Sequence, residues 1–520
     1  MNRWFLATLA LLAGIGLALR VPGLRLRPMH NDEGVNAMKF RALWVNNNYK
    51  YDPNEFHGPT LPYMTLPSAW ASGTHDFNQF TETTFRIVPV VFGTGLILLL
   101  LILAPDFGKM ESLWAGAIIA VSPAMVFYSR YYIHEMLLVF FTALGFFSLW
   151  RWVNTNRWGW ALTAGIGLGL MAATKETFVF AVAALVFAIG SSAVWSRWRE
   201  PGASRLKWQG RATHTVLLAA TALAIAVLFF TSFFTNKQGL LDAVRTYGPW
   251  LRRAGGETVH AHPWPFYFQR LFWFHSAGGP VWSEAFVGVL AAVGFLVALF
   301  GTLRPLLRLI AFYTFWLTLI YTVVAYKTPW CLLGFYHGMI LLAGVGAASV
   351  LRACKKVGLR TAAGLALAIG VAQLGWQAWR GNFGLTQSGV PYCASPKNPY
   401  VYSQTSPDIL RLLGIVDALA HVSPDGYNTI VEVISPQSYG PLPWYLRRFN
   451  KIGYWDQIPD QPLVPIMIVS ADLHAALDER PGKTHLMAGY FQLRPNVFME
   501  LYVSTALWAE YVKTLPPEPD

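Results

Sequence analysis

The sequence predicts an α-helical polytopic membrane protein with about eleven transmembrane helices and a small extracytoplasmic α/β domain at the C-terminal end. Of its 520 residues, 54% are hydrophobic and only 13% are charged, whereas soluble domains have about 25% charged residues. Apolar stretches of about 17 to 25 residues recur up to residue 380, and each is long enough to cross a hydrocarbon layer about 30 Å thick. An ordinary soluble globule is therefore excluded.

The predicted spans also determine the orientation of the chain. Their odd number places the two termini on opposite sides of the membrane. Most of the net charge of +13 falls on the side of the N-terminus, and cytoplasmic loops are rich in Lys and Arg, so this side is predicted to be cytoplasmic. The chain is then a multi-pass protein of the cell (inner or plasma) membrane, surrounded by membrane lipids, and its charge needs no nucleic-acid partner. The predicted spans are residues 4–20, 84–104, 112–128, 134–151, 159–174, 177–194, 213–234, 281–301, 308–326, 331–350 and 360–379.

Two domains are expected. Residues 1–380 form the transmembrane domain, with outer loops at 21–83 and 235–280. Residues 381–520 combine a helical pattern near 408–419 with apolar runs at 429–434 and 465–469, separated by Pro, Gly and Ser. This pattern is typical of a small α/β domain.

Ionisable residues are scarce at the centres of the spans and gather where spans emerge on the predicted outer side. A transporter of polar cargo usually needs charged groups or broken helices near the middle of the bilayer. The distribution therefore favours chemistry at the outer interface.

The first such group is the acidic pair Asp32 and Glu33, about a dozen residues after the first span. Two adjacent carboxylates do not share a face of a regular element, so one can face a substrate while the other is held structurally. A carboxylate at a partly desolvated interface has a raised pKa, which suits a general base. The alternative is that Asp32 caps the helical run that follows it.

A second group, Arg130, His134 and Glu135, lies within six residues of a short outer turn. An arginine, an imidazole and a carboxylate can hold a phosphate directly or through a divalent metal ion. The alternative is ordinary anchoring at the membrane interface. Spacing alone does not separate the two.

Lys175 and Lys327 each occupy a tight outer turn between two spans. A lysine in such a turn either pairs with a lipid phosphate or extends its ammonium group into the headgroup layer. The turns by themselves favour the second interpretation.

The second outer loop carries His260, His262 and the nearby Trp264 among many aromatic residues. A His-x-His pair is weak evidence for zinc, and the aromatic content favours a lid or a segment in contact with lipid or acceptor. His57 lies in a Gly-Pro turn of the first loop, where it is either incidental or a further contact of this kind.

Taken together, these residues resemble the GT-C glycosyltransferases that use polyprenyl-phosphate sugars, including protein O-mannosyltransferases and aminoarabinose transferases. Within that superfamily the chain is most similar to a prokaryotic group called flippase activity-associated. The carriers of the wider resemblance are Asp32-Glu33, Ser129-Arg130-Tyr131 through Glu135, Thr174-Lys175-Glu176 and Lys327-Thr328-Pro329-Trp330. The similarity to the flippase activity-associated group is carried by His30-Asn31-Asp32-Glu33-Gly34, His57-Gly58-Pro59, His262-Pro263-Trp264 and Pro441 through Arg447.

The resemblance implies a role for each group. Asp32 is expected to deprotonate the acceptor with the support of Glu33. The cations are expected to neutralise the phosphate that leaves, and the His-Glu pair to orient that phosphate or a divalent metal ion. The superfamily has an acidic pair at this position, whereas this chain has a His-Glu pair. The resemblance therefore does not imply that this chain requires a metal ion. The cations are Arg130, Lys175 and Lys327, and the pair is His134 and Glu135.

The implied reaction is inverting transfer of a sugar from a polyprenyl-phosphate donor to a lipid, glycan or protein acceptor on the outer face. No nucleotide cofactor is expected, because nucleotide sugars are made in the cytoplasm. The alternative is a non-catalytic flippase or accessory protein that binds lipid-linked sugars. Both need the cations, but only the enzyme needs the base.

Overall fold

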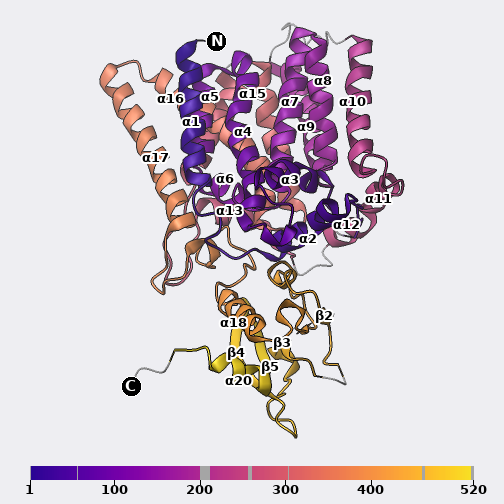
Figure 1. The fold of residues 1–520 in the computed structure, drawn as a ribbon. Helices are drawn as coiled ribbons and strands as arrows, with labels where there is room; N and C mark the ends of the chain where they lie inside the picture. Colours follow the sequence, from indigo (N-terminus) through magenta and orange to yellow (C-terminus); the bar gives the residue numbers. More distant parts are fainter. Residues whose placement is uncertain are drawn as a thin grey trace.

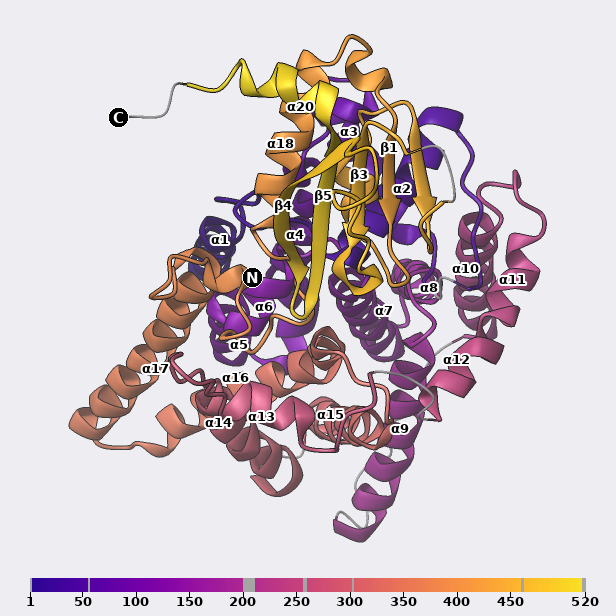
Figure 2. The same ribbon diagram turned by 90° about the horizontal axis from the view of Figure 1, so that it is seen from below.

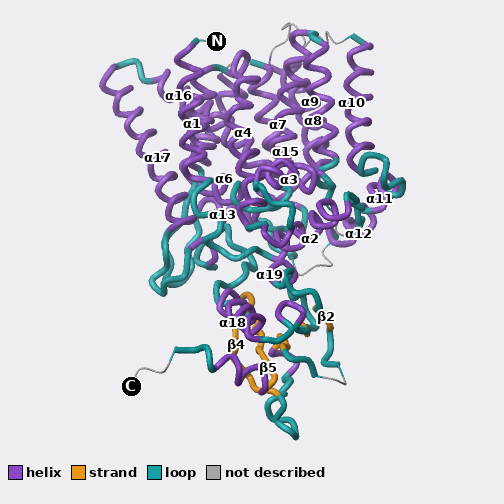
Figure 3. Tube along the Cα trace, in the orientation of Figure 1, coloured by secondary structure: helices purple, strands orange, loops and turns teal. Residues whose placement is uncertain are grey.

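The computed structural model describes residues 2–54, 57–199, 211–255, 260–301, 304–459 and 463–516. A bundle of long helices makes up most of the molecule, and a smaller domain that contains a β-sheet lies at one end of it (Figures 1 and 3). The N-terminus lies at the opposite end of the bundle (Figure 1). The predicted fold class, a polytopic helical protein with a small C-terminal α/β domain, is confirmed.

Each of the eleven predicted spans falls mostly on helical residues. Eight helices are long and apolar enough to cross a membrane, and two more apolar helices are shorter. The remaining predicted span is divided at Ser122, whose hydroxyl caps the second part by accepting a hydrogen bond from the amide of Met125. The long helices are α1 (Arg3–Arg20), α4 (Glu82–Phe107), α7 (Glu135–Thr155), α9 (Phe178–Arg199), α10 (Ala212–Phe230), α15 (Pro305–Val323), α16 (Leu333–Ala353) and α17 (Val357–Phe383); the others are α5 (Lys109–Val121), α6 (Pro123–Tyr128), α8 (Trp158–Ala172) and α14 (Ala285–Leu296).

The segments between the spans on the side of the sheet domain are themselves largely helical. The first outer loop forms α2 (Asn31–Asn46) and α3 (Thr60–Ala71), and the second forms α11 (Gly239–Arg245), α12 (Tyr247–Ala254) and α13 (Phe266–Phe272). Figure 1 shows these short helices between the bundle and the sheet domain. They form the rim on which the candidate site is built.

The C-terminal domain contains a five-stranded mixed sheet in the order β2-β1-β3-β5-β4. Strand β1 pairs in parallel with both of its neighbours, β2 and β3, whereas β5 is antiparallel to β3 and β4. Helices α18 (Ile409–Val422) and α20 (Thr505–Val512) share a buried apolar core with the sheet. The strands are β1 (Val431–Ile434), β2 (Ile452–Trp455), β3 (Ile466–Ser470), β4 (His485–Arg494) and β5 (Val497–Ser504). The predicted domain boundary at residue 380 stays a prediction.

A short helix, α19 (Leu442–Tyr445), attaches this domain to the first outer loop. The hydroxyl of Tyr445 accepts a hydrogen bond from the amide of Met29 at 2.8 Å. Trp444 is buried against Phe77 and Phe85. Seen from below, the sheet domain therefore lies over α2, α3 and α4 (Figure 2). This contact sets the position of the domain above the candidate site.

Candidate active site

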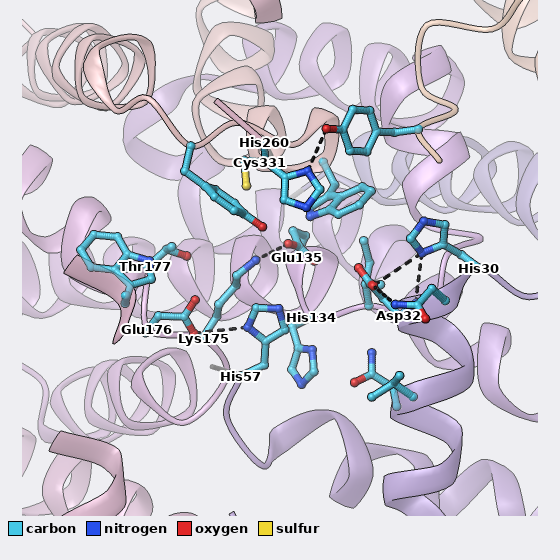
Figure 4. A pocket seen from close by; sticks show the side chains of 18 of the residues that line it. His30, Asp32, His57, His134, Glu135, Lys175, Glu176, Thr177, His260 and Cys331 are labelled. Carbon is cyan, nitrogen blue, oxygen red and sulfur yellow. Dashed lines mark hydrogen bonds and ion pairs between the residues drawn. The ribbon is translucent and has the colours of Figure 1, made fainter. Parts of the chain in front are cut away.

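A polar cavity of about 760 Å³ lies between the helical bundle and the C-terminal domain. Its walls come from the start of α2, the start of α7, the turn between α8 and α9, the segment before α16 and four residues of the C-terminal domain. Figure 4 shows Asp32 and His30 across the cavity from Lys175 and Glu176. The predicted site residues that line it are Asp32, His57, His134, Glu135, Lys175 and His260.

Asp32 occupies the first turn of α2, where its neighbours hold it toward the cavity. The His30 side chain caps the helix by accepting a hydrogen bond from the Asp32 amide at 3.1 Å. The Asn31 amide donates to a carboxylate oxygen of Asp32 at 3.2 Å, and the Asn31 carbonyl accepts from the Ser438 hydroxyl at 3.0 Å. Because Ser438 belongs to the C-terminal domain, docking of that domain helps to orient Asp32. The Asp32 side chain is 38% exposed.

Glu33 faces the other way and does not line the cavity. Its buried carboxylate accepts hydrogen bonds from both Arg27 and Arg86, at 2.8 and 2.7 Å for the shortest of each. It also accepts from the amide of Tyr132 at 2.9 Å. Burial alone would raise the pKa of Glu33, but the two guanidinium groups hold it well below its usual value. Glu33 is therefore the counter-ion of two buried arginines, and its predicted support of Asp32 stays a prediction.

Lys175 and Glu135 form a buried ion pair on the opposite wall. Burial alone would lower the pKa of Lys175, but the carboxylate of Glu135 raises it well above its usual value, so the ammonium group stays charged. Glu135 begins α7, and Lys175 lies in the turn between α8 and α9. The pair therefore places a permanent cation at the edge of the bundle.

The turn that contains His57 pairs with the turn that contains Lys175. Residues His57 and Lys175 form an antiparallel bridge, in which the amide of Gly58 donates to the carbonyl of Thr174 at 3.0 Å. A Cβ atom on Gly58 would lie 2.1 Å from the carbonyl oxygen of Ala173, so only glycine allows this approach. The pairing holds the imidazole of His57 where its Nδ1 donates to a carboxylate oxygen of Glu176 at 3.3 Å.

His134 lies beside this pair, with its ring centroid 5.0 Å from that of His57. Its Nε2 lies 3.1 Å from the carbonyl oxygen of Gly58. A carbonyl only accepts hydrogen bonds, so Nε2 carries the proton and Nδ1 holds a lone pair. Nδ1 is buried and has no hydrogen-bond partner among the residues that the structure describes. Burial, then the nearby His57 and Lys175, hold the pKa of His134 well below its usual value, so the ring stays neutral.

Arg130 does not line the cavity, in contrast to the role expected for it. Its guanidinium donates to the backbone carbonyls of Arg20, Pro22 and Gly23 at 2.6–2.9 Å. The group also lies over the ring of Phe383, 4.8 Å from the centroid. These contacts tie the end of α1 to the turn that contains Arg130.

Two of the remaining predicted residues gather around Tyr402, which itself lines the cavity. Both His260 and His262 contact the Tyr402 hydroxyl, at 2.8 and 3.0 Å. Lys327 is 1% exposed and donates to the carbonyl of His262, so it supports the second outer loop and does not reach the cavity. Trp264 is 67% exposed and lies outside the cavity.

An apolar cavity of about 240 Å³ continues from the polar one into the bundle. It lies among α7, α9, α15 and α16, and its lining includes Leu138, Ala181, Ile310 and Leu341. The residues that line both cavities are Glu135, Lys175, Thr177, Tyr321, Trp330 and Cys331. The buried ion pair therefore stands where a polar chamber meets an apolar one.

Among the residues that the structure describes, no group of three or more His, Cys, Asp or Glu side chains is arranged to hold a metal ion. His134 and Glu135 are adjacent in sequence, but the carboxylate of Glu135 is bound to Lys175. The predicted alternative of a metal-binding His-Glu pair thus gains no support from this geometry.

Some cavity residues were not predicted from the sequence. Glu176 directly follows the predicted Lys175 in the sequence. This adjacency is the signal that could have identified Glu176 as a cavity residue. Tyr402, Ser438 and Arg494 come from beyond residue 400 and also line the cavity. No local pattern marks them, because only folding brings the C-terminal domain over the membrane domain.

Known proteins resemble this chain in sequence over part of its length and in fold. Residues 63–240 match the family model described as dolichyl-phosphate-mannose-protein mannosyltransferase. No relative is found among the curated proteins. One similar solved structure is ArnT from Cupriavidus metallidurans bound to undecaprenyl phosphate, with 14% identity, a TM-score of 0.64, and coverage of 97% of this chain and 98% of that one.

The Archaeoglobus fulgidus oligosaccharyltransferase has a similar fold. Its structure tethered to an acceptor peptide is 14% identical, has a TM-score of 0.54, and aligns with 87% of this chain and 64% of that one. Its complex with Zn and sulfate is 12% identical and has a TM-score of 0.51, over 89% of this chain and 68% of that one. These membrane glycosyltransferases share the fold of this chain, as the resemblance to the GT-C superfamily predicts, and the family model matches residues 63–240.

Proposed function

We propose that this protein transfers a sugar from a polyprenyl-phosphate donor to an acceptor on the extracytoplasmic face, with inversion at the anomeric carbon. The observation that carries this proposal is the position of Lys175 at the junction of the polar and apolar cavities. A polyprenyl phosphate has a charged head on an apolar chain, and both parts need a matching environment. Undecaprenyl phosphate, present in the ArnT structure, is a lipid of this kind.

In this proposal the apolar cavity receives the first part of the isoprenoid chain and Lys175 binds the phosphate. Glu135 holds the ammonium group in place in the absence of the donor. A preorganised cation in a buried site stabilises the charge that develops on the leaving phosphate, and one such group is worth about 3–4 kcal/mol.

Asp32 is the proposed general base. It lies across the cavity from Lys175 and is exposed enough to meet an acceptor (Figure 4). The acceptor hydroxyl gives its proton to Asp32 while its oxygen bonds to the anomeric carbon. The bond from that carbon to the phosphate oxygen breaks, and the polyprenyl phosphate leaves with the electron pair. Attack from the face opposite the phosphate inverts the configuration.

The orientation belongs to the same proposal. The cavity lies at the end of the bundle that carries the C-terminal domain, opposite the N-terminus (Figure 1). With the N-terminus in the cytoplasm, as the distribution of Lys and Arg favours, the site faces outward. The donor then reaches the site already attached to its lipid.

The test uses the full-length protein in liposomes, undecaprenyl phosphate carrying a radiolabelled hexose, and a cell-envelope fraction as the source of acceptor. Asp32→Asn is expected to abolish release of undecaprenyl phosphate and to leave binding of the donor intact. Asp76→Asn is the matched control, because Asp76 is an exposed residue of the same outer loop. Unchanged transfer by Asp32→Asn would overturn the base assignment. Movement of the donor between leaflets without an acceptor would favour the flippase.

A further inference from the structure

Two side chains in the corner of the cavity next to Lys175 present hydrogen-bond acceptors. Glu176 contributes a buried carboxylate that accepts a hydrogen bond from the side chain of His57. His134 contributes the lone pair of its Nδ1, since its Nε2 proton is used by the carbonyl of Gly58. An ionised phosphate has only acceptors and cannot donate a hydrogen bond to either group, whereas a hydroxyl can donate to both.

We propose that His134 and Glu176 form the subsite that recognises hydroxyl groups of the sugar on the lipid-linked donor. This inference rests on the proposed function, because it takes the phosphate to lie at Lys175. The cavity wall then presents a hydrogen-bond donor at Lys175 and hydrogen-bond acceptors at His134 and Glu176. A phosphosugar shows the complementary change, from an acceptor phosphate to donor hydroxyls.

The free nitrogen of His134 supports a ligand at this place. A buried acceptor that lacks a partner destabilises a folded protein, and among the described residues His134 Nδ1 has none although the residue is only 2% exposed. The ring of His57 packs against that of His134 and its side chain is one-third exposed. A sugar hydroxyl reaches Nδ1 by displacing this imidazole from the neighbouring ring.

The rigidity of the corner supports selectivity. The bridge between His57 and Lys175, and the close contact of Gly58 with Ala173, tie together two loops from distant parts of the chain. The Thr60 hydroxyl adds a further bond to the hydroxyl of Thr174 at 2.8 Å. Acceptors held in this way discriminate between sugars that present a hydroxyl and analogues that lack it, because the deoxy analogue leaves them unpaired.

The experiment measures equilibrium binding to the full-length protein in nanodiscs. The probes are undecaprenyl phosphate, the same lipid carrying mannose, glucose or galactose, and monodeoxy analogues of the hexose that binds best. His134→Gln keeps a donor for the carbonyl of Gly58 and removes the acceptor at the position of Nδ1. His134→Asn keeps an acceptor near that position. His485→Gln is the matched control, because the Nε2 of His485 contacts the carbonyl of Val464 at 2.8 Å in the distant sheet domain.

The wild type is expected to bind the best hexose donor more tightly than undecaprenyl phosphate. His134→Gln is expected to lose about three- to tenfold of the affinity for that donor, to bind undecaprenyl phosphate as the wild type does, and to stop discriminating against one deoxy analogue. His134→Asn is expected to keep much of the preference, and His485→Gln all of it. If His134→Gln does not fold, Glu176→Gln carries the same expectations.

Several outcomes would overturn the inference. One is an equal loss for the glycosylated and the bare lipid, which would make His134 part of the phosphate site or of the scaffold. Another is a preference of the wild type that EDTA removes, which would make Nδ1 a metal ligand. A third is the absence of any preference for a hexose over the bare lipid. Failure of the proposed function is distinct, because neither lipid would then bind in a manner that depends on Lys175.

Discussion

Neighbouring carboxylates in α2 are expected to give opposite phenotypes when each is neutralised. Glu33→Gln should destabilise the protein by about 3–5 kcal/mol, the usual cost of leaving a buried charge without its partner. This loss of unfolding free energy is expected because Arg27 and Arg86 are both buried and both donate hydrogen bonds to the Glu33 carboxylate. An amide in its place would cancel the negative charge and direct an NH₂ group at these donors.

Asp32→Asn provides the comparison within the same turn. The Asp32 side chain is 38% exposed, and its carboxylate accepts a hydrogen bond from the side-chain amide of Asn31. This change should alter the free energy of unfolding by no more than about 0.5 kcal/mol. Transfer should fall by about 10²- to 10⁴-fold, the usual contribution of a general base.

The assay follows thermal unfolding in detergent by Trp and Tyr fluorescence, together with release of undecaprenyl phosphate from a labelled donor. Glu33→Gln should lower Tm clearly, and Asp32→Asn should leave Tm unchanged. Equal stability of Glu33→Gln and the wild type would refute the assignment of Glu33 as a structural counter-ion. A large fall in Tm for Asp32→Asn would refute the division of roles between the two residues.

The same pair predicts the direction of a pH effect. Arg27 and Arg86 hold the pKa of Glu33 below its usual value in the folded protein, although burial opposes them. The ionised carboxylate therefore contributes stability that is fully present above the unfolded pKa of about 4.3 and is lost as the pH falls through the lower, folded pKa. The difference in Tm between the wild type and Glu33→Gln should be constant from about pH 6 to 8 and shrink toward pH 4 and below. A difference that grows on acidification would contradict this linkage.

Three further changes test the cavity. Gly58→Ala places a Cβ 2.1 Å from the carbonyl of Ala173, so Tm should fall, with a cost of about 1–3 kcal/mol, and donor binding should weaken. Lys175→Met should cost about 3–5 kcal/mol by leaving Glu135 buried and unpaired and should abolish donor binding; adding Glu135→Gln should restore Tm but not binding. Ala181→Phe narrows the apolar cavity and should weaken binding of undecaprenyl phosphate about tenfold, the loss of about two buried methylene groups. A short-chain lipid phosphate should be affected less.

Residues with strong local signals were placed well by sequence reasoning. Each apolar run near the length of a bilayer became a helix, because a backbone in hydrocarbon must satisfy its hydrogen bonds internally. The same reasoning anticipated that Asp32 and Glu33 would diverge, since successive residues of a helix point in different directions. It did not decide which of them faces the cavity.

The cations show where sequence reasoning ends. Arg130, Lys175 and Lys327 look alike in sequence, since each follows or precedes a span on the same side. In the structure, Arg130 and Lys327 are bound by backbone carbonyls, and of the three only Lys175 lines the described cavity. The partners of Arg130 are about a hundred residues away in the chain, so no local pattern could reveal them.

The amino-acid sequence by itself determined the class of the protein, its helical spans and the side on which its unusual residues lie, because hydrophobic length and charge placement act locally along the chain. The tertiary structure alone decided which charges are structural counter-ions, which nitrogen of His134 is free, and that the C-terminal domain closes over Asp32. These depend on contacts between segments that are distant in sequence, and the energy of a buried charge or hydrogen bond is set by the partner that folding supplies.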